Sequence, residues 1–531
     1  MAIRRLAIAL LLSSVFVASA QTINAASCSS TDVQSALNNV KADGTTVNIP
    51  AGTCAWTTTV TYNQNFSTTI QGAGSTTGSD SLGNPTGYND QTIIQDNVPH
   101  NPNDNPVLQV NTINGKTFEL SGMSFYGSAS NPTVTYHGVV RISGTSQAAR
   151  VDHNHFYHNN VVNLVWNGYI FGVIDRNVFT ESVNDADGIR PEEAAWQGDT
   201  SGNGNQSWAD SEHFGTNQFV FAENNSFQAD SSVCTGQCHA FAFDCDEFGG
   251  RFVFRYNSVG FHEAFQTHGT GSGGDNRSCR AMEIYKNNIT WSNNPINDNW
   301  FALLMLEGGT GLYWGNTVTG HKQFVDADVI RNNSDTYPQG APPNGWGFCK
   351  ASPISSVVGP SSWDHNNAGQ DGWPCLDQIG RGQGDLLTGY MPHKLNNSTG
   401  SIAWPHQALV PVYLWMNTFN PVPQENNRYW SNYGDVTVEN RDYYLELPNL
   451  NENASFNGTA GVGFGALSAR PAACTPMVAY WATDNNTLYQ CGNGNSWSSY
   501  YTPFTYPHPL TQGTTQTQAP QAPTGLTATV N

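Results

Sequence analysis

One short motif recurs along most of this chain: Asn, any residue, then a bulky apolar residue, each time at the end of a strand-like run. The successive intervals are 23, 48, 32, 30, 29 and 101 residues, so most suit one coil of a β-solenoid and the two long ones suit a coil plus an insertion. An Asn at each coil bend can hydrogen-bond to the next and tolerates a tight turn. The motif therefore predicts a stacked β-architecture with structural Asn residues: Asn154, Asn177, Asn225, Asn257, Asn287, Asn316 and Asn417.

Strand alternation around the motif predicts which side chains face inward and which face outward. The position three residues before each Asn is expected inside the solenoid: Val151, Ile174, Ala222, Phe254, Ile284, Tyr313 and Leu414. The position two residues before is expected to face outward, and we call these seven residues the outward column: Asp152, Asp175, Glu223, Arg255, Tyr285, Trp314 and Trp415.

The outward column changes from charged to aromatic residues along the expected axis. Aromatic rings stack on sugars, and carboxylates or Arg can transfer protons or stabilise charge, so the column suits a polysaccharide-binding surface. The alternative is that an insertion at 320–408 covers the aromatic residues while the charged residues form solvated pairs.

The N-terminus and the net charge limit location and partners. Arg4 and Arg5, an apolar run over 6–17 and the small residues at 18–20 predict a secretory signal over residues 1–20, so the protein is expected to be secreted or held at the cell surface. No later run is long and apolar enough to predict a membrane span. The formal charge of −20 weighs against nucleic acid as a partner.

Ten Cys in an exported chain favour disulfides over metal sites. Local pairing predicts three bonds and leaves four Cys to pair among themselves. The predicted bonds are Cys28 with Cys54, Cys349 with Cys375 and Cys474 with Cys491, and the remaining Cys are Cys234, Cys238, Cys245 and Cys279.

The chain divides into a signal, one long domain and a short tail. Apolar residues at helical spacing within 28–56 predict a helix that caps the first coil of a domain over 21–510. Insertions are expected at about 183–217, 267–280 and 320–408. Residues 511–531 indicate a linker followed by the opening strand of a fibronectin type III-like module.

Several segments resemble secreted bacterial right-handed parallel β-helix proteins of the pectate-lyase-like superfamily. They are "VNIPAGTCAW", "HAFAFDCDEFGGRFVFRYN", "THGT", "RAMEIYKNN" and "GGTGLYWGNTVTG". The resemblance implies an all-β, right-handed parallel β-helix with an N-terminal capping helix and long loop insertions. The superfamily includes polysaccharide lyases, glycoside hydrolases, esterases, tailspikes and adhesins, so the resemblance is more specific for fold than for activity.

The densest group of charged residues lies in the central coil, and its candidate catalytic members are Asp244, Arg251, His268, Arg280 and Glu283. A lyase needs a base and a cation, which is Arg or Ca²⁺, whereas a hydrolase needs two carboxylates. The alternative is structural pairing of Asp244 with Arg251 and of Arg280 with Glu283. Convergence of these side chains in one open cleft would favour catalysis, and scattered or buried side chains would favour a binding protein.

Two other groups contain potential metal ligands. Asp185 and Asp187 lie in an oxygen-rich loop that is a candidate for Ca²⁺, although it lacks the full spacing of an EF-hand. His153, His155 and His158 are interpreted as turn and surface groups. The sequence thus predicts an enzyme that degrades an extracellular polysaccharide, more specifically a lyase acting by β-elimination. The alternatives are a glycoside hydrolase on the same fold and a non-catalytic glycan-binding surface or matrix protein.

Overall fold

The computed structural model describes residues 21–127, 138–159, 162–181, 186–200, 202–230, 240–245, 248–260, 264–267, 277–291, 302–327, 377–384, 407–421, 428–432, 437–446 and 455–512. The predicted Cys349–Cys375 bond, the signal over 1–20 and the tail beyond residue 512 lie outside these ranges.

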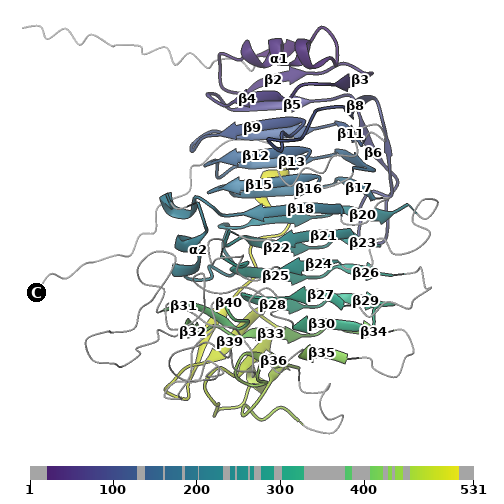
Figure 1. The fold of residues 1–531 in the computed structure, drawn as a ribbon. Coiled ribbons are helices and arrows are strands. Elements are labelled where there is room, and N and C mark those ends of the chain that lie inside the picture. Colours follow the sequence, from purple (N-terminus) through teal and green to yellow (C-terminus); the bar gives the residue numbers. More distant parts are fainter. Residues whose placement is uncertain are drawn as a thin grey trace, which may run out of the picture.

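Three long sheets of parallel strands wind around a common core and form a parallel β-helix (Figure 1). Sheet A contains β1(Thr22–Asn24), β2(Thr45–Asn48), β5(Thr68–Gln71), β10(Phe118–Ser121), β13(Ala149–Asp152), β16(Gly172–Asp175), β19(Val220–Glu223), β22(Arg251–Arg255), β25(Ala281–Tyr285), β28(Thr310–Trp314), β33(Val412–Trp415) and β36(Tyr443–Leu445). Sheet B contains β3(Gly52–Trp56), β8(Thr92–Asp96), β11(Ser124–Tyr126), β14(His155–Tyr157), β17(Val178–Glu181), β20(Ser226–Ala229), β23(Ser258–Val259), β26(Asn288–Thr290), β29(Thr317–Thr319) and β34(Thr418–Asn420).

The third sheet completes each coil. Sheet C contains β4(Val60–Asn63), β9(Leu108–Thr112), β12(Val140–Gly144), β15(Leu164–Gly168), β18(Ala186–Glu192), β21(Ala240–Cys245), β24(Phe265–Thr267), β27(Ala302–Leu306), β30(Gln323–Ala327) and β35(Arg428–Asn432). The structure confirms the predicted all-β solenoid of stacked parallel strands.

The seven motif Asn stack in one line at the bend between sheets A and B. The Nδ2 atom of each Asn donates to the Oδ1 atom of the next at 2.9–3.2 Å. The same Oδ1 atom accepts the backbone N–H of the preceding Asn at 2.8–3.1 Å. Side-chain amides thus satisfy backbone groups that the bend removes from the sheets, which confirms the structural role.

The predicted interior column is also confirmed. All seven residues are at most 2% exposed and belong to the solenoid core. The parallel register places Phe254 beside Ile284 and Ile284 beside Tyr313. A shift of one residue would turn this column outward, so the apolar pattern fixes the register.

Each motif Asn follows a residue in the left-handed backbone region. The φ values at His153, Arg176, Asn224, Tyr256, Lys286, Gly315 and Met416 lie between 51° and 63°. Such a backbone reverses direction within two residues and projects this side chain at the corner between sheets A and B. The position accepts many residue types, so its side chain is available for function.

The N-terminal end is capped by α1(Ser30–Asn38), as predicted. Ser29 caps this helix by accepting the N–H of Asp32, and Val33, Ala36 and Leu37 are buried. The Cys28–Cys54 disulfide ties the start of the helix to β3. The cap covers the apolar end that an open first coil would expose.

The C-terminal part folds back along the outward face of sheet A. A small sheet of β37(Val462–Gly465), β38(Ala479–Ala482), β39(Thr487–Cys491) and β40(Trp497–Tyr501) leads to the short helix η6(Pro509–Gln512). In Figure 1 this yellow segment rises from the last coils to the level of β16. It forms a second apolar core with outward-facing residues of sheet A, among them Val173, Phe221, Leu312 and Trp415.

A second segment, residues 73–91 with β6(Ser75–Thr77) and β7(Gly87–Asn89), runs beside the Asn corner. Tyr88 Oη donates to the backbone oxygen of His153 at 2.6 Å, and Asp90 pairs with His155 at 2.9 Å. Further along, Asp80 accepts from Ser258 Oγ at 2.5 Å. The segment therefore links coils that are far apart in the sequence.

The disulfides agree with the pairings that can be examined. Cys474–Cys491 is present as predicted, and Cys245 pairs with Cys279, which selects one bond among the four Cys left open. Among the described residues, no helix has the length and apolar character needed to cross a membrane. The remaining described elements are α2(Asn205–Ala209), β31(Arg381–Gly384), β32(Gln407–Leu409), η1(Trp196–Gly198) and η5(Leu467–Ala469).

Candidate active site

The outward face of sheet A changes abruptly between β13 and β16. In β2 and β5 buried residues alternate with partly exposed ones, and β10 and β13 each keep one partly exposed residue. Every residue of β16, β19, β22, β25, β28 and β33 is buried. The outward column therefore does not form one continuous open strip. It has a covered aromatic end, a clamped middle and an acidic end at the boundary.

The aromatic end is covered. Tyr285, Trp314 and Trp415 stack on one another, with ring centroids 4.5 and 5.8 Å apart, and Trp481 packs against both Trp rings. Stacked rings under a second sheet offer no free face to a sugar. The expected open strip is absent here, and the C-terminal sheet supplies a cover, while most of the insertion at 320–408 lies outside the described residues.

The middle of the column holds the C-terminal segment. Arg255 donates to the backbone oxygens of Phe504 and Thr505 at 2.7 and 2.8 Å, and its Nε atom donates to Glu223 at 2.8 Å. Glu223 also accepts the N–H of His508 at 2.8 Å. These two residues are buried in a clamp, and in this conformation they do not face solvent.

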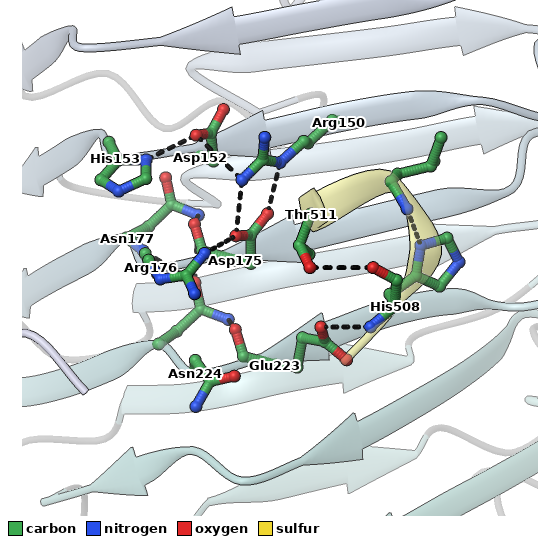
Figure 2. Close-up of polar contacts among 12 residues, drawn as sticks. Arg150, Asp152, His153, Asp175, Arg176, Asn177, Glu223, Asn224, His508 and Thr511 are labelled. Atoms are coloured by element: carbon green, nitrogen blue, oxygen red, sulfur yellow. Dashed lines mark hydrogen bonds and ion pairs between the residues drawn. The ribbon is translucent and has the colours of Figure 1, made fainter. Parts of the chain in front are cut away.

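The acidic end is organised by Arg150, as Figure 2 shows for its contacts with Asp152 and Asp175. The guanidinium forms a two-bond pair with Asp175 at 2.8 and 2.9 Å and contacts Asp152 at 3.2 Å. It also contacts Glu119 at 3.1 Å. One cation thus holds carboxyl groups from three successive strands, and we call these four residues with His153 and Arg176 the Arg150 cluster.

His153 lies at the exposed corner of this cluster. Its Nδ1 atom is 2.5 Å from Asp152 Oδ2, and 34% of its side chain is exposed. Because a carboxylate that accepts a hydrogen bond from Nδ1 fixes the tautomer and orients the ring, Nε2 becomes the proton-accepting atom. The cluster therefore contains an oriented, accessible base.

Arg176 occupies the equivalent corner of the next coil (Figure 2). Its Nη1 atom contacts Asp175 at 3.0 Å, while 41% of its side chain is exposed. A guanidinium in this position can bind a carboxylate supplied by a ligand. Base and cation are then adjacent on one corner of the solenoid.

Glu119 is a partly exposed carboxyl group whose pKa is raised. Burial and the nearby Asp152 carboxylate raise its pKa, and Arg150 only partly offsets these effects. About a third of its side chain (33%) is exposed. A protonated carboxyl group here can donate to a leaving oxygen, whereas the deeply buried Asp175, whose pKa is also raised by burial, supports Arg150.

Two of the predicted catalytic residues, Arg251 and Arg280, are buried in structural contacts. Arg251 donates to Ser207 and to the backbone oxygen of Ser211 and stacks 4.1 Å from the Trp196 ring. The Arg280 side chain donates to the backbone oxygen of Asp210 at 3.0 Å. Arg251 and Arg280 thus fix the insertion at 196–215 to the solenoid.

The other predicted catalytic residues lie elsewhere. Glu283 accepts the N–H of Gly215 and the hydroxyl of Tyr501, both at 2.7 Å. Asp244 is on sheet C, where it pairs with Arg190 at 2.9 Å, and His268 lies outside the described residues. The four described residues do not form one open cluster, and neither of the two expected structural pairs is found among them.

Only one residue of the calcium candidate, Asp187, lies in the described part of the chain. Asp187 pairs with Arg190 at 2.7 Å, and Asp185 lies outside the described residues. The described part of the chain contains no group of three or more His, Cys, Asp or Glu side chains suited to a metal ion. Calcium binding at this insertion remains a prediction.

Sequence reasoning placed Asp152 and Asp175 in the right column but interpreted His153 as a turn group. A usable signal was present, because His153 directly follows an outward Asp and directly precedes a motif Asn. The residue directly before a motif Asn is always the corner residue. No comparable sequence signal identifies Glu119, because its coil lacks a motif Asn.

No family model and no curated protein matches the chain. Among solved structures, an alginate lyase from Paenibacillus sp. str. FPU-7 shows 14% identity and a TM-score of 0.29, covering 56% of this chain and 95% of that one. ORF18 of Geobacillus virus E2 shows 11% identity and a TM-score of 0.29, with 90% and 86% covered. The catalytic domain of a GH87 α-1,3-glucanase in complex with nigerose shows 10% identity and a TM-score of 0.29, with 78% and 68% covered. Similarities at this level carry no argument about activity.

Proposed function

We propose that this protein is an extracellular polysaccharide lyase that cleaves a uronic-acid polymer by β-elimination at the Arg150 cluster. The observation that carries the proposal is the Asp152-oriented, accessible His153 beside the exposed Arg176 and the raised-pKa carboxyl of Glu119. The three disulfides among the described residues support an oxidising location.

Each group has one role in the reaction. Arg176 binds the substrate carboxylate and stabilises the enolate-like charge, which makes the adjacent C–H bond more acidic. His153 Nε2 takes that proton, a C=C bond forms, and the C–O bond to the neighbouring sugar breaks. Glu119 supplies a proton to the departing oxygen, so protons and electrons balance without a redox partner.

Glycoside hydrolysis is the second candidate, because Glu119 and Asp152 are neighbouring carboxyl groups that share Arg150. Glu119 would act as the acid and Asp152 as the second carboxylate, but the two groups contact each other here and would have to separate to about 5 Å or more to flank a glycosidic bond. A hydrolase releases reducing ends without a new double bond. Product chemistry therefore separates the two reactions.

The test is a screen of the purified protein against uronic-acid and neutral polysaccharides, with added Ca²⁺ and with a chelator. We expect unsaturated products, detected by ultraviolet absorbance, from at least one uronic-acid polymer. Reducing ends without absorbance would favour the hydrolase. Binding without any product would favour the non-catalytic glycan-binding protein.

A matched pair of variants assigns the base. His158 is also a corner residue with φ of 51°, and it pairs with Asp230 at 2.9 Å on the sheet B side. His153→Ala is expected to lower kcat by about 10²-fold or more, as for loss of a general base, while His158→Ala leaves it unchanged. Equal losses in both variants would refute the role of His153.

A further inference from the structure

The outward face of sheet A before β16 is polar and partly exposed, and we call it the open face. Its outward side chains in the coils before β10 are Thr22, Asn24, Thr46, Asn48, Thr69 and Gln71. They carry hydroxyl and amide groups but no charge. Thr69 Oγ1 donates to Glu119 at 3.1 Å, so the open face is continuous with the Arg150 cluster.

The same sheet is closed immediately beyond the cluster. Leu510 packs in the apolar core that includes Val173, and His508 is held by Glu223. Figure 2 shows His508 and Thr511 beside Asp175 and Glu223, on the side of the cluster away from β13. Past this point every strand of sheet A through β33 lies under cover.

The open face is long enough for a short run of sugars on one side of the Arg150 cluster only. Five strands, β1, β2, β5, β10 and β13, lie side by side in the sheet. At ~4.8 Å between strands they span about 19 Å along the axis. Hydroxyl and amide side chains at this spacing can hydrogen-bond to sugar hydroxyls, whereas beyond the cluster a chain would meet the C-terminal segment.

Resting on the proposed function, we infer that the polymer reaches the Arg150 cluster from the open face alone and that the protein acts on chain ends. The C-terminal segment stops the chain just past the scissile bond, so each event releases a short product of fixed size. The uncharged open face binds the polymer mainly through sugar hydroxyls, while carboxylate recognition is concentrated at Arg176.

The product profile over time tests this inference with the full-length protein and the best polymer from the screen. We expect one small product from the first time point and a slow fall in viscosity. An early ladder of intermediate sizes would overturn end-wise action while leaving the lyase proposal intact. Absence of product from every polymer would overturn the proposed function itself.

A second experiment uses a bulky residue on the open face. Thr46 lies on β2, two strands before Glu119, and is partly exposed. Thr46→Trp is expected to raise KM for the polymer at least ~10-fold, on the scale of one or two lost hydrogen bonds, while kcat for a trisaccharide stays within about twofold. The control is Gln95→Trp, at an exposed outward position of β8 on sheet B.

The two variants give a clear decision. An increase in polymer KM for Thr46→Trp alone supports an entry over the open face. Unchanged polymer kinetics for Thr46→Trp would overturn it, since a Trp on the path of the chain must interfere with binding. Circular dichroism confirms that both variants are folded.

Discussion

The buried carboxyl group of Glu283 links the solenoid to its C-terminal cover and makes stability depend on pH. It accepts hydrogen bonds from Gly215 in the 196–215 insertion and from Tyr501 in β40. Burial raises its pKa to about 7 from the ordinary value of 4.5, although both bonds and Arg255 oppose the shift. The folded protein therefore binds this proton more tightly than the unfolded chain does.

The sign and size of the effect follow from linkage. Between pH 4.5 and 7 the folded state holds the proton while the unfolded state has lost it, so stability falls as the pH rises through this window. A difference of 2.5 pKa units corresponds to about 3 kcal/mol at most. The stabilisation is fully present below pH 4.5 and is lost above pH 7.

Glu283→Gln isolates this contribution. The amide cannot ionise, its oxygen still accepts the Gly215 N–H, and its NH₂ group can donate to the Tyr501 oxygen. We expect the variant to match the wild type near pH 4 and to exceed it by about 3 kcal/mol near pH 8. Urea unfolding followed by circular dichroism at several pH values gives this difference, and other titrating groups cancel. Parallel pH curves for the two proteins would refute the reasoning.

Two further predictions concern the Asn stack and the clamp. Asn257→Ala removes the partner of the buried Asn225 N–H and should lower the free energy of urea unfolding by about 3 kcal/mol. Asn417→Ala, at the partly exposed end of the stack, should lower it by less than half as much. Equal losses in the two variants would contradict the stacking argument. Arg255→Met leaves Glu223 buried without its cation and should destabilise the folded protein by about 3–5 kcal/mol. Backbone amides over 504–512 should then exchange hydrogen faster. Unchanged exchange would show that the clamp does not hold this segment.

The fold was predictable because its rules are local. A motif Asn every coil and an apolar residue three positions earlier fix the bend, the register and the interior. Cys28–Cys54 and the capping helix follow from short separations in the sequence. Each of these features depends on neighbouring coils or neighbouring turns.

The functional surface was harder to predict, because alternation tells which face a residue occupies but not what covers that face. Trp314 and Trp415 face outward as expected, yet Trp481 packs on them from a later segment. The density of charged residues in the central coil indicated a catalytic site, but the Arg251 guanidinium donates hydrogen bonds to backbone carbonyls of the 196–215 insertion. His153 became visible as a candidate only once the corner position was known to project its side chain beside Asp152.

The C-terminal cover also has a consequence for how the chain is made. Coils up to β13 present polar residues outward, so they can fold as they leave the ribosome without a later segment to cover them. Later coils emerge with aromatic rings such as Tyr285, Trp314 and Trp415 uncovered, and their cover is synthesised only afterwards. A partly synthesised chain therefore exposes an apolar aromatic surface until residues 462–508 are added. A premature stop near residue 460 would leave this surface exposed and the molecule prone to self-association.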